Sequence, residues 1–256
     1  KGFLHCDMLV IGAGPAGLMA ANEAAANGLE VIICDEDFVF GGRLNSDDEM
    51  IESLNGIDWV NKKIIELSSL KNVRLMSRTT VYGAFDHGIF GALERKTDHL
   101  AKSEGKPRQI LWKIFSKRSI LCAGAIERSI SFGNNDRPGI LLSSALRSYV
   151  SRWAIRPGNR IAIFTNNNDG WKTARLLKQK GCNVVAIIDP RKNSAEQLDN
   201  TPTFKGKNII STKGINSIKA IILSDGTKIK VDCLGVSGGW NPNLHLTCHQ
   251  RGQPKW

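Results

Sequence analysis

Residues 9–17, Leu-Val-Ile-Gly-Ala-Gly-Pro-Ala-Gly, are an apolar strand that runs directly into a glycine-rich turn. A helix-forming run, 18–27, follows this turn, and a second apolar strand, 31–34, ends in Asp35. A dinucleotide-binding βαβ unit requires a strand, a turn, a helix and an acidic strand end in this order. The sequence therefore predicts an α/β fold that begins with a Rossmann-like unit over residues 6–35.

The three glycines of the turn have different roles in such a unit. Gly12 permits the tight turn, Gly14 lets the backbone approach a pyrophosphate, and Gly17 lets the helix pack closely on the sheet. The backbone N–H groups of the turn and the positive end of the helix that follows it attract phosphates. We therefore predict that Gly12, Gly14, Pro15 and Ala16 contact a dinucleotide.

An acidic residue stands where the adenosine ribose would lie. Asp35 is 23 residues beyond Gly12, and its carboxylate can accept hydrogen bonds from ribose hydroxyls. Glu36 is the alternative for this role. A carboxylate here would repel the 2′-phosphate of NADP. The competing interpretation is a degenerate fold that has kept the turn and lost the ligand.

Composition limits the function classes. The chain has 256 residues, 41% of them hydrophobic, which suggests one or two domains. No apolar run approaches the roughly 20 residues of a membrane span, so no membrane partner is predicted. The net charge is +11, but the basic residues are dispersed and have no aromatic–basic recognition motif, so no nucleic-acid partner is predicted. The first residue is Lys1, which suggests a piece of a longer chain.

The cysteines indicate a reducing compartment. The chain has six, and none form a C-x-x-C pair. Three of them, Cys34, Cys122 and Cys233, lie in apolar runs, where cysteine usually acts as a small hydrophobic residue. We therefore predict a cytoplasmic protein without a disulfide framework and without the redox dithiol of disulfide reductases.

Hydrophobic periodicity predicts the elements after the first unit. Residues 51–70 form an amphipathic helix pattern, and 73–76 a short strand. Two β-like segments, 79–96 and 109–121, flank a polar turn, and a helix pattern covers 142–153.

A second βαβ pattern follows, with a strand at 161–164, a helix at 171–180 and a strand at 183–188 that ends in Asp189. We interpret its turn, 165–170, as lacking the three glycines, and hence as a nucleotide-site shape without a phosphate cradle. The segments 218–223 and 227–231 are joined by Ser-Asp-Gly, which predicts a hairpin.

Three glycine-containing segments resemble the two-dinucleotide-binding-domain flavoproteins. They are Gly41-Gly42, Cys122-Ala123-Gly124 and Gly239-Trp240-Asn241-Pro242, although that family often has Ala-Thr-Gly at the second. The resemblance implies a Rossmann-like FAD/NAD(P)-binding domain, a β-meander, and a smaller Rossmann-like domain inserted into the first. The first domain would comprise 1–157 and a truncated 236–256, and the insertion 158–235.

Four longer segments, 78–87, 124–128, 134–139 and 237–242, resemble the alpha subunits of heterotetrameric sarcosine oxidases. In those oxidoreductases a beta subunit oxidises the amine on FAD, FMN lies between alpha and beta, and alpha binds NAD in its first nucleotide site. The resemblance implies a nucleotide-binding middle piece of an oxidase that demethylates sarcosine or a related secondary amino acid. Its partners would be the beta subunit and further subunits. The chain lacks the family's N-terminal and folate-binding domains and its closing Gly-Asp segment, so we expect it to be inactive alone and to hold no catalytic residue.

The resemblance also implies further cofactor contacts. Gly42, Arg43 and Leu44 would pass the pyrophosphate, with a solvated loop as the alternative for Arg43. Thr80 and Val81 would meet the adenine, unless they serve packing alone. Ala123 and Gly124 would be small because a cofactor or a neighbouring strand approaches them closely.

Several interpretations remain open at this stage. FAD is the alternative to NAD in the first site. The alternatives in function are an autonomous FAD-dependent NAD(P)H oxidoreductase and a non-catalytic Rossmann scaffold. The loop 134–139 is either an interface or FMN-facing loop or a hydrogen-bonded structural turn. His245, Cys248 and His249 have metal-like spacing but too few ligands, so no metal site is predicted.

Overall fold

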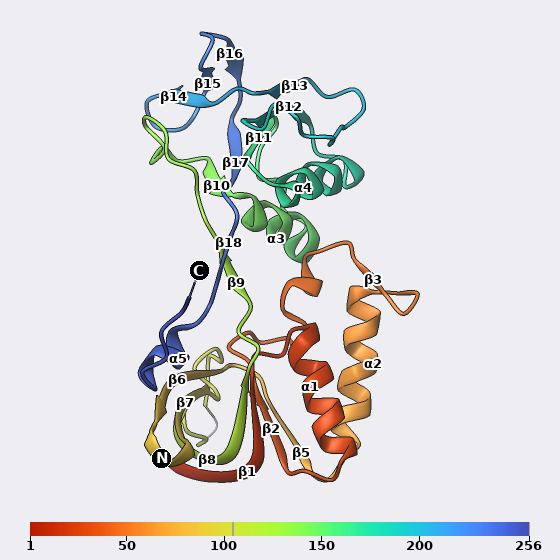
Figure 1. Cartoon of the computed structure of the whole chain (residues 1–256), viewed down its shortest axis with the longest axis vertical. Helices are drawn as coiled ribbons and strands as arrows, with labels where there is room; N and C mark the ends of the chain where they lie inside the picture. Colours follow the sequence, from red (N-terminus) through yellow and green to blue (C-terminus); the bar gives the residue numbers. More distant parts are fainter. Residues whose placement is uncertain (104, 256) are drawn as a thin grey trace. The chain divides into compact units, whose positions relative to one another are not determined.

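The computed structural model describes residues 1–103 and 105–255, and its internal contacts divide the chain into two compact units. Unit 1 comprises Lys1–Gly124 and Pro242–Trp256, and unit 2 comprises Ala125–Asn241 (Figure 1). Unit 2 extends beyond the predicted insertion at both ends. The reason is that strand β10 (Ile140–Leu142) pairs with β17 (Cys233–Ser237), so residues before 158 share a sheet with residues near 235.

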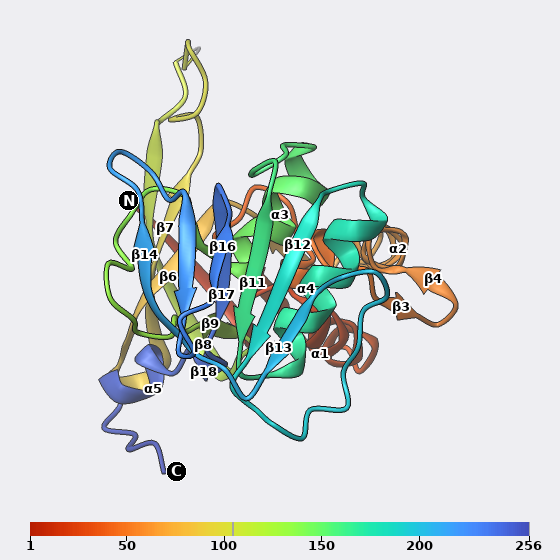
Figure 2. The ribbon, with the colours of Figure 1, turned by 90° about the horizontal axis from the view of Figure 1, so that it is seen from above.

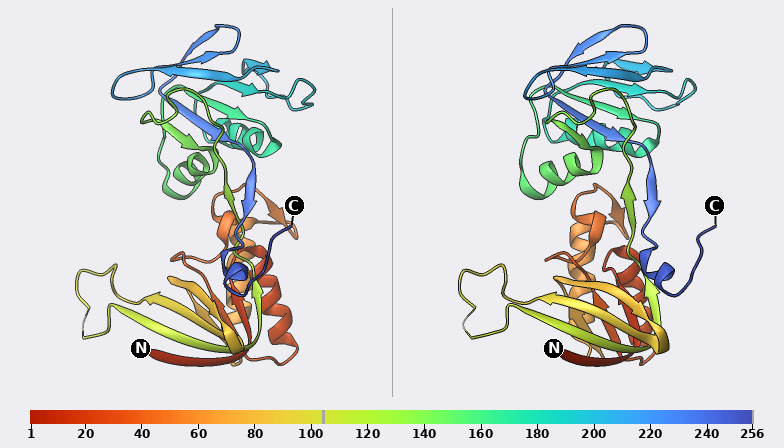
Figure 3. Two further views of the ribbon diagram at one scale, coloured as in Figure 1. Left: turned by 60° about the vertical axis from the view of Figure 1, so that its left-hand side comes forward. Right: turned by 90° about the vertical axis from the view of Figure 1, so that its left-hand side faces the viewer.

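Unit 1 contains a mixed six-stranded sheet in the order β5-β2-β1-β8-β7-β6. The strands β1, β2 and β5 are parallel, β8 runs parallel to β1, and β6, β7 and β8 form an antiparallel meander (Figure 3). The predicted meander is therefore present. The bounds are β1 Gly2–Ile11, β2 Val31–Cys34, β5 Val73–Met76, β6 Thr79–Phe85, β7 Ile89–Arg95 and β8 Gln109–Leu121.

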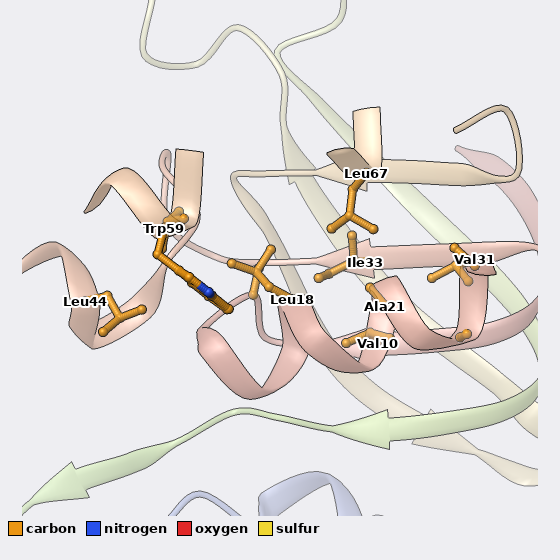
Figure 4. Close-up of a cluster of buried hydrophobic side chains, with 12 residues drawn as sticks. Val10, Leu18, Ala21, Val31, Ile33, Leu44, Trp59 and Leu67 are labelled. Atoms are coloured by element: carbon orange, nitrogen blue, oxygen red, sulfur yellow. The ribbon is translucent and has the colours of Figure 1, made fainter. Parts of the chain in front are cut away.

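The two faces of the parallel strands in unit 1 are covered differently. Helices α1 (Pro15–Ala26) and α2 (Gly56–Ser68) cover one face, where Leu18 and Trp59 pack with Val10 and Ile33 (Figure 4). The meander covers the other face, where its buried side chains join those of the alternate residues of β1 and β2. Because side chains alternate along a strand, both faces of these continuous apolar strands are buried. The remaining elements are η1 Gly42–Asn45, β3 Met50–Ile51, β4 Leu54–Asn55, η2 Asp86–Gly88 and α5 His245–His249.

Unit 2 repeats this plan with a parallel five-stranded sheet in the order β10-β17-β11-β12-β13. Helices α3 and α4 pack on one face, and a separate antiparallel sheet, β14-β15-β16, packs on the other (Figure 2). The predicted α/β fold with two Rossmann-like units is confirmed. The bounds are β9 Ala125–Glu127, α3 Ser143–Trp153, β11 Ile161–Thr165, α4 Asn168–Gln179, β12 Val184–Asp189, β13 Thr203–Lys205, β14 Ile209–Lys213, β15 Ala220–Leu223, β16 Lys228–Lys230 and β18 Trp240–Pro242.

Some predicted bounds are wrong for local reasons. The helix predicted at 51–70 begins only at Gly56, because β3 and β4 pair as a small hairpin and the Asn55 side chain caps the helix by accepting from Asp58 N at 2.9 Å. The segment predicted as 79–96 is two strands, interrupted where His87 adopts φ +61°. Within 1–103 and 105–255, no helix has both the length and the apolar character needed to cross a bilayer.

The loop 134–139 is fixed to β14 by hydrogen bonds between residues distant in sequence. Arg137 Nε donates to Thr212 Oγ1 at 3.0 Å, and its Nη1 donates to the Gly214 carbonyl. Asn134 Nδ2 donates to Ser211 Oγ at 3.1 Å. These bonds favour the structural-turn interpretation of the loop.

We predict that Arg137→Ala lowers the free energy of unfolding by about 1–3 kcal/mol, because Thr212 and the Gly214 carbonyl each lose a donor. Denaturant unfolding of the variant and of the wild type measures this difference. Arg137→Lys is the matched control, and it should recover part of the loss. Unchanged stability together with impaired assembly with a partner subunit would instead support the interface interpretation.

Candidate nucleotide-binding site

The turn after β1 is closed by two glycines. Gly12 has φ +98°, and a Cβ atom there would lie 2.3 Å from the carbonyl oxygen of Cys122, at the end of β8. A Cβ atom on Gly17 would lie 1.8 Å from the Gly12 carbonyl oxygen. Both positions therefore require glycine for packing, and the predicted roles of these residues in the turn agree with this geometry.

Gly14 differs from these two glycines because space is open around it. An added Cβ would meet only Gly42 Cα, at 4.0 Å, while a Cβ on Gly42 would lie 3.1 Å from Gly14 Cα. The Gly41 amide holds this second loop in place by donating to the Ala13 carbonyl at 2.8 Å. Gly14 and Gly42 thus form a strip of bare backbone, which we call the glycine cradle. Its exposed main chain suits a pyrophosphate.

The N-terminus of α1 is available to an anion. Gly14 is its N-cap residue and supplies no side chain, Pro15 stands at the first helical position, and the first turn contains no acidic residue. No side chain therefore satisfies the first N–H groups, which point out of the helix beside the glycine cradle. Free amide donors and the helix dipole together make an anion site.

The Asp35 carboxylate lies beside the β1–α1 turn and stabilises it by accepting hydrogen bonds. Its Oδ2 accepts from Ala13 N at 2.6 Å and its Oδ1 accepts from Asp37 N at 2.9 Å. Burial raises the pKa of Asp35, and these two hydrogen bonds oppose the rise. Each oxygen retains a lone pair for a ribose hydroxyl. Glu36, the alternative acid, has an exposed side chain, and its carbonyl accepts from Arg95 Nη2 at 2.5 Å.

Two of the residues that follow the cradle have other contacts in the structure. Arg43, in η1, pairs with Asp47, which lies two residues beyond the end of that helix, at 3.0 Å. Leu44 is 5% exposed and packs in the core with Trp59 and Leu18, as Figure 4 shows. Of the three predicted residues in this loop, Gly42 is therefore the one that lies beside Gly14 without a side chain. A role for Arg43 would require its pair with Asp47 to open.

The remaining predicted contacts lie on strand β6 and just beyond the end of strand β8. Thr80 and Val81 are half-buried on β6, the edge strand of the sheet, and Val81 also packs against the core. Ala123 and Gly124 lie two and three residues beyond the end of β8, and Gly124 has φ +66°, with nothing within 4 Å of the position that a Cβ atom would take. The backbone at Gly124 therefore leaves room for a ligand.

The structure adds Phe38 and Arg78 to the candidate residues. Arg78 Cζ lies 5.2 Å from the centre of the Phe38 ring, and Arg78 N donates to the Asp37 carbonyl at 2.8 Å. Phe38 remains 43% exposed beside the acidic end of β2. The sequence signal was an aromatic residue after an acidic strand end, which by itself is too common to indicate a site.

The corresponding turn of unit 2 retains one glycine of the motif. A Cβ on Gly170 would lie 2.4 Å from the Thr165 side chain, so Gly170 takes the packing role of Gly17. The interpretation that this turn has none of the three glycines is therefore corrected. At the position of Gly14, Asn167 caps α4, and its Oδ1 accepts from the amides of Asp169 and Gly170 at 2.9 and 3.3 Å.

Side chains of the protein itself occupy the rest of the second site. Asp169, in the first turn of α4, accepts from Arg147 Nη2 at 2.6 Å and from Trp240 Nε1 at 3.2 Å. Asp189 is fully buried and accepts from Trp171 Nε1 at 2.8 Å. Burial tends to raise its pKa, but the hydrogen bonds from Arg191 and Trp171 outweigh burial and lower it. A carboxylate therefore lies where a phosphate would bind, and the acidic strand end is already paired.

The three residues with metal-like spacing do not gather. The ring of His245 contacts the Asn243 side chain, and His249 Nδ1 lies 3.5 Å from the Ala84 amide. Within the described ranges, no cluster of three His, Cys, Asp or Glu side chains could hold a metal ion.

Comparisons with known proteins agree with this geometry. A family model described as "FAD binding domain" matches residues 7–47. The chain is 39% identical to the sarcosine oxidase subunit alpha of Rhizobium meliloti (strain 1021), over 100% of this chain and 26% of that protein. It is 35% identical to the sarcosine oxidase subunit alpha of Corynebacterium sp. (strain U-96), over 99% of this chain and 28% of that protein. The chain is a homologue of the sarcosine oxidase alpha subunits. It spans about a quarter of their length.

Solved structures support the fold. L-proline dehydrogenase from P. horikoshii aligns with a TM-score of 0.77 at 23% identity, over 99% of this chain and 46% of that chain. Thioredoxin reductase from Lactococcus lactis aligns with a TM-score of 0.72 at 17% identity, over 94% of this chain and 80% of that chain. The fold is thus the two-dinucleotide-binding α/β fold of these enzymes.

We predict that Gly14→Ala folds normally but binds dinucleotide at least about tenfold more weakly, a loss of about 1.4 kcal/mol. The added methyl group has room in the protein but projects into the glycine cradle. Isothermal titration with NAD measures the loss, and thermal unfolding checks the fold. Gly17→Ala is the contrasting variant, because its methyl group would meet the Gly12 carbonyl and should destabilise the turn itself. Wild-type affinity in Gly14→Ala would rule out the cradle as the pyrophosphate site.

Proposed function

We propose that unit 1 binds NAD at the glycine cradle, and that the chain is the nucleotide-binding region of the alpha subunit of a sarcosine-oxidase-like complex. The observation that carries the proposal is the contrast between two helix N-termini. That of α1 has no side-chain cap and faces bare backbone, while that of α4 is capped by Asn167 and carries Asp169. Homology to sarcosine oxidase alpha subunits over the whole chain supports the same assignment.

The acidic environment of the ribose favours NAD over NADP. Asp35 lies at the end of β2, with Glu36 and Asp37 directly after it. A 2′-phosphate would meet these carboxylates, whereas a 2′-hydroxyl can donate to Asp35. FAD shares the ADP portion of NAD, so the family match over residues 7–47 is compatible with either cofactor. Our choice of NAD rests on the resemblance to the alpha subunits.

The proposed chemistry belongs to the complex. A beta subunit would oxidise sarcosine or a related secondary amino acid on FAD, and FMN would lie where it meets the alpha subunit. When bound, these flavins would supply the hydride-accepting chemistry. Residues of this chain would bind and orient the dinucleotide: Gly14 and Gly42 its pyrophosphate, and Asp35 its ribose. We propose a cytoplasmic location, because all six cysteines are free.

Two alternatives are less well supported. An autonomous FAD-dependent NAD(P)H oxidoreductase needs two nucleotide sites, and Asp169, Asn167 and Arg147 fill the second one. A non-catalytic scaffold would not need the open glycine cradle. We therefore keep both as outcomes of the test.

We predict that the purified chain binds one NAD, retains no stoichiometric flavin and does not oxidise sarcosine alone. Mass spectrometry of the nucleotides released on denaturation, followed by calorimetric titration with NAD and with FAD, measures this. Gly14→Ala serves as the control that assigns the binding to unit 1. Stoichiometric FAD with NADH-dependent dye reduction would establish an autonomous reductase instead. Binding of neither nucleotide would indicate a scaffold.

A further inference from the structure

The positive charge of the chain is concentrated in unit 2. Unit 2 holds 18 of the 35 Lys and Arg residues but only 8 of the 24 Asp and Glu residues, a formal charge of +10. Unit 1 holds the other 17 and 16, a formal charge of +1. The basic residues are therefore not evenly dispersed, although the sequence alone suggests that they are. Charge of one sign on one unit indicates an oppositely charged partner.

Part of this charge lies on one face of the sheet formed by β14, β15 and β16, the light-blue to blue strands in Figure 3. Lys213 pairs with Ala220, which in turn pairs with Lys230, so these three residues share a face. Lys228 pairs with Ile222 two residues along the same face. We call Lys213, Lys228 and Lys230, with Ala220 and Ile222 between them, the lysine face. The opposite face of this sheet carries Ile209, Ile221 and Leu223 into the core of unit 2.

Among the described residues, no acidic side chain neutralises the positive charge of the lysine face. Lys213, Lys228 and Lys230 are exposed and form no ion pair among the described residues. The nearby acids are occupied, since Asp225 pairs with Lys207 at 3.2 Å and Asp232 accepts from the amides of Asn159 and Arg160. The central strand β15 separates Lys213 from Lys228 and Lys230, so the three ammonium groups spread over the face as unneutralised positive charge. Such charge attracts an acidic partner.

The apolar residues around these lysines indicate what kind of molecule covers them. Ile215, in the turn between β14 and β15, is 92% exposed, and Ile210 on β14 is 52% exposed. None of the five residues of the lysine face is aromatic, so it offers no ring to stack on a base, and Arg160, at its edge, already donates from Nε to the Lys230 carbonyl at 3.1 Å. Exposed isoleucines beside lysines suit a protein surface on which carboxylates surround an apolar patch.

We infer that the lysine face is the docking surface for an acidic surface of a partner protein. This inference rests on the proposed function, which makes the chain one subunit of a complex, and it adds where a subunit attaches. The site is distinct from the glycine cradle, because every residue in it belongs to unit 2. Assembly should therefore weaken at high salt, since exposed charge pairs are screened.

The test is the triple variant Lys213→Glu, Lys228→Glu, Lys230→Glu in the full chain, assayed against the sarcosine-oxidase-type beta subunit of the same organism. We expect assembly, measured by light scattering and by binding kinetics, to weaken at least about tenfold, with NAD affinity unchanged. The matched control is Lys62→Glu, Lys71→Glu, Lys180→Glu, which changes the net charge equally at exposed lysines elsewhere and should assemble as the wild type does. The corresponding Lys→Ser triple, which introduces no new charge, should show a smaller loss in the same direction.

Each other outcome overturns the inference in a recognisable way. Equal assembly of the wild type and the lysine-face variant would overturn this surface and leave the proposed function intact. Equal losses in the two Glu triples would show a general charge effect rather than a docking surface. Intact assembly with lost binding of a single-stranded DNA 20-mer would assign the face to nucleic acid. A wild-type chain that binds NAD but not the beta subunit would remove the proposed complex, and this inference with it.

Discussion

The structure of the first site depends on the close approach of the β1–α1 turn to the end of β8. The carbonyl oxygen of Cys122 lies only 2.3 Å from the position that a Cβ on Gly12 would take, and the Cys122 amide donates to the Ile11 carbonyl at 2.7 Å. Because this contact fixes the turn, α1 begins directly beside the loop that contains Gly42. Gly14 then lies directly beside Gly42, and Asp35 can accept from the Ala13 amide. The site is thus a consequence of backbone packing.

The two units show how the same layered plan can lead to an open or a filled site. Both place helices on one face of parallel strands and an antiparallel meander on the other. In unit 2, Asn167 satisfies the helix N-terminus and Asp169 adds a carboxylate that Arg147 neutralises. A helix N-terminus whose donors are satisfied and which already bears an anion has little affinity for a phosphate. A few side chains at the helix N-terminus therefore determine whether this fold leaves a phosphate site open or fills it.

Local patterns in the sequence were enough to predict many of the longer elements and the glycine-rich turn. The bounds of β5 and β8 agree with the predicted 73–76 and 109–121, because hydrophobic periodicity and flanking turns act over a few residues. Contacts between distant residues could not be predicted in this way. Examples are Arg137 with Thr212, and Arg147 with Asp169. The burial of Leu44 likewise depends on α2, which follows it in the chain.

We propose that the turn of unit 1 is open to a dinucleotide and that the protein's own side chains fill the corresponding turn of unit 2. Hydrogen–deuterium exchange of the chain with and without saturating NAD tests both parts in one measurement. We predict slower amide exchange at residues 12–17 and 41–44 and no change at 165–171. Protection at 165–171, or none at 12–17, would contradict it.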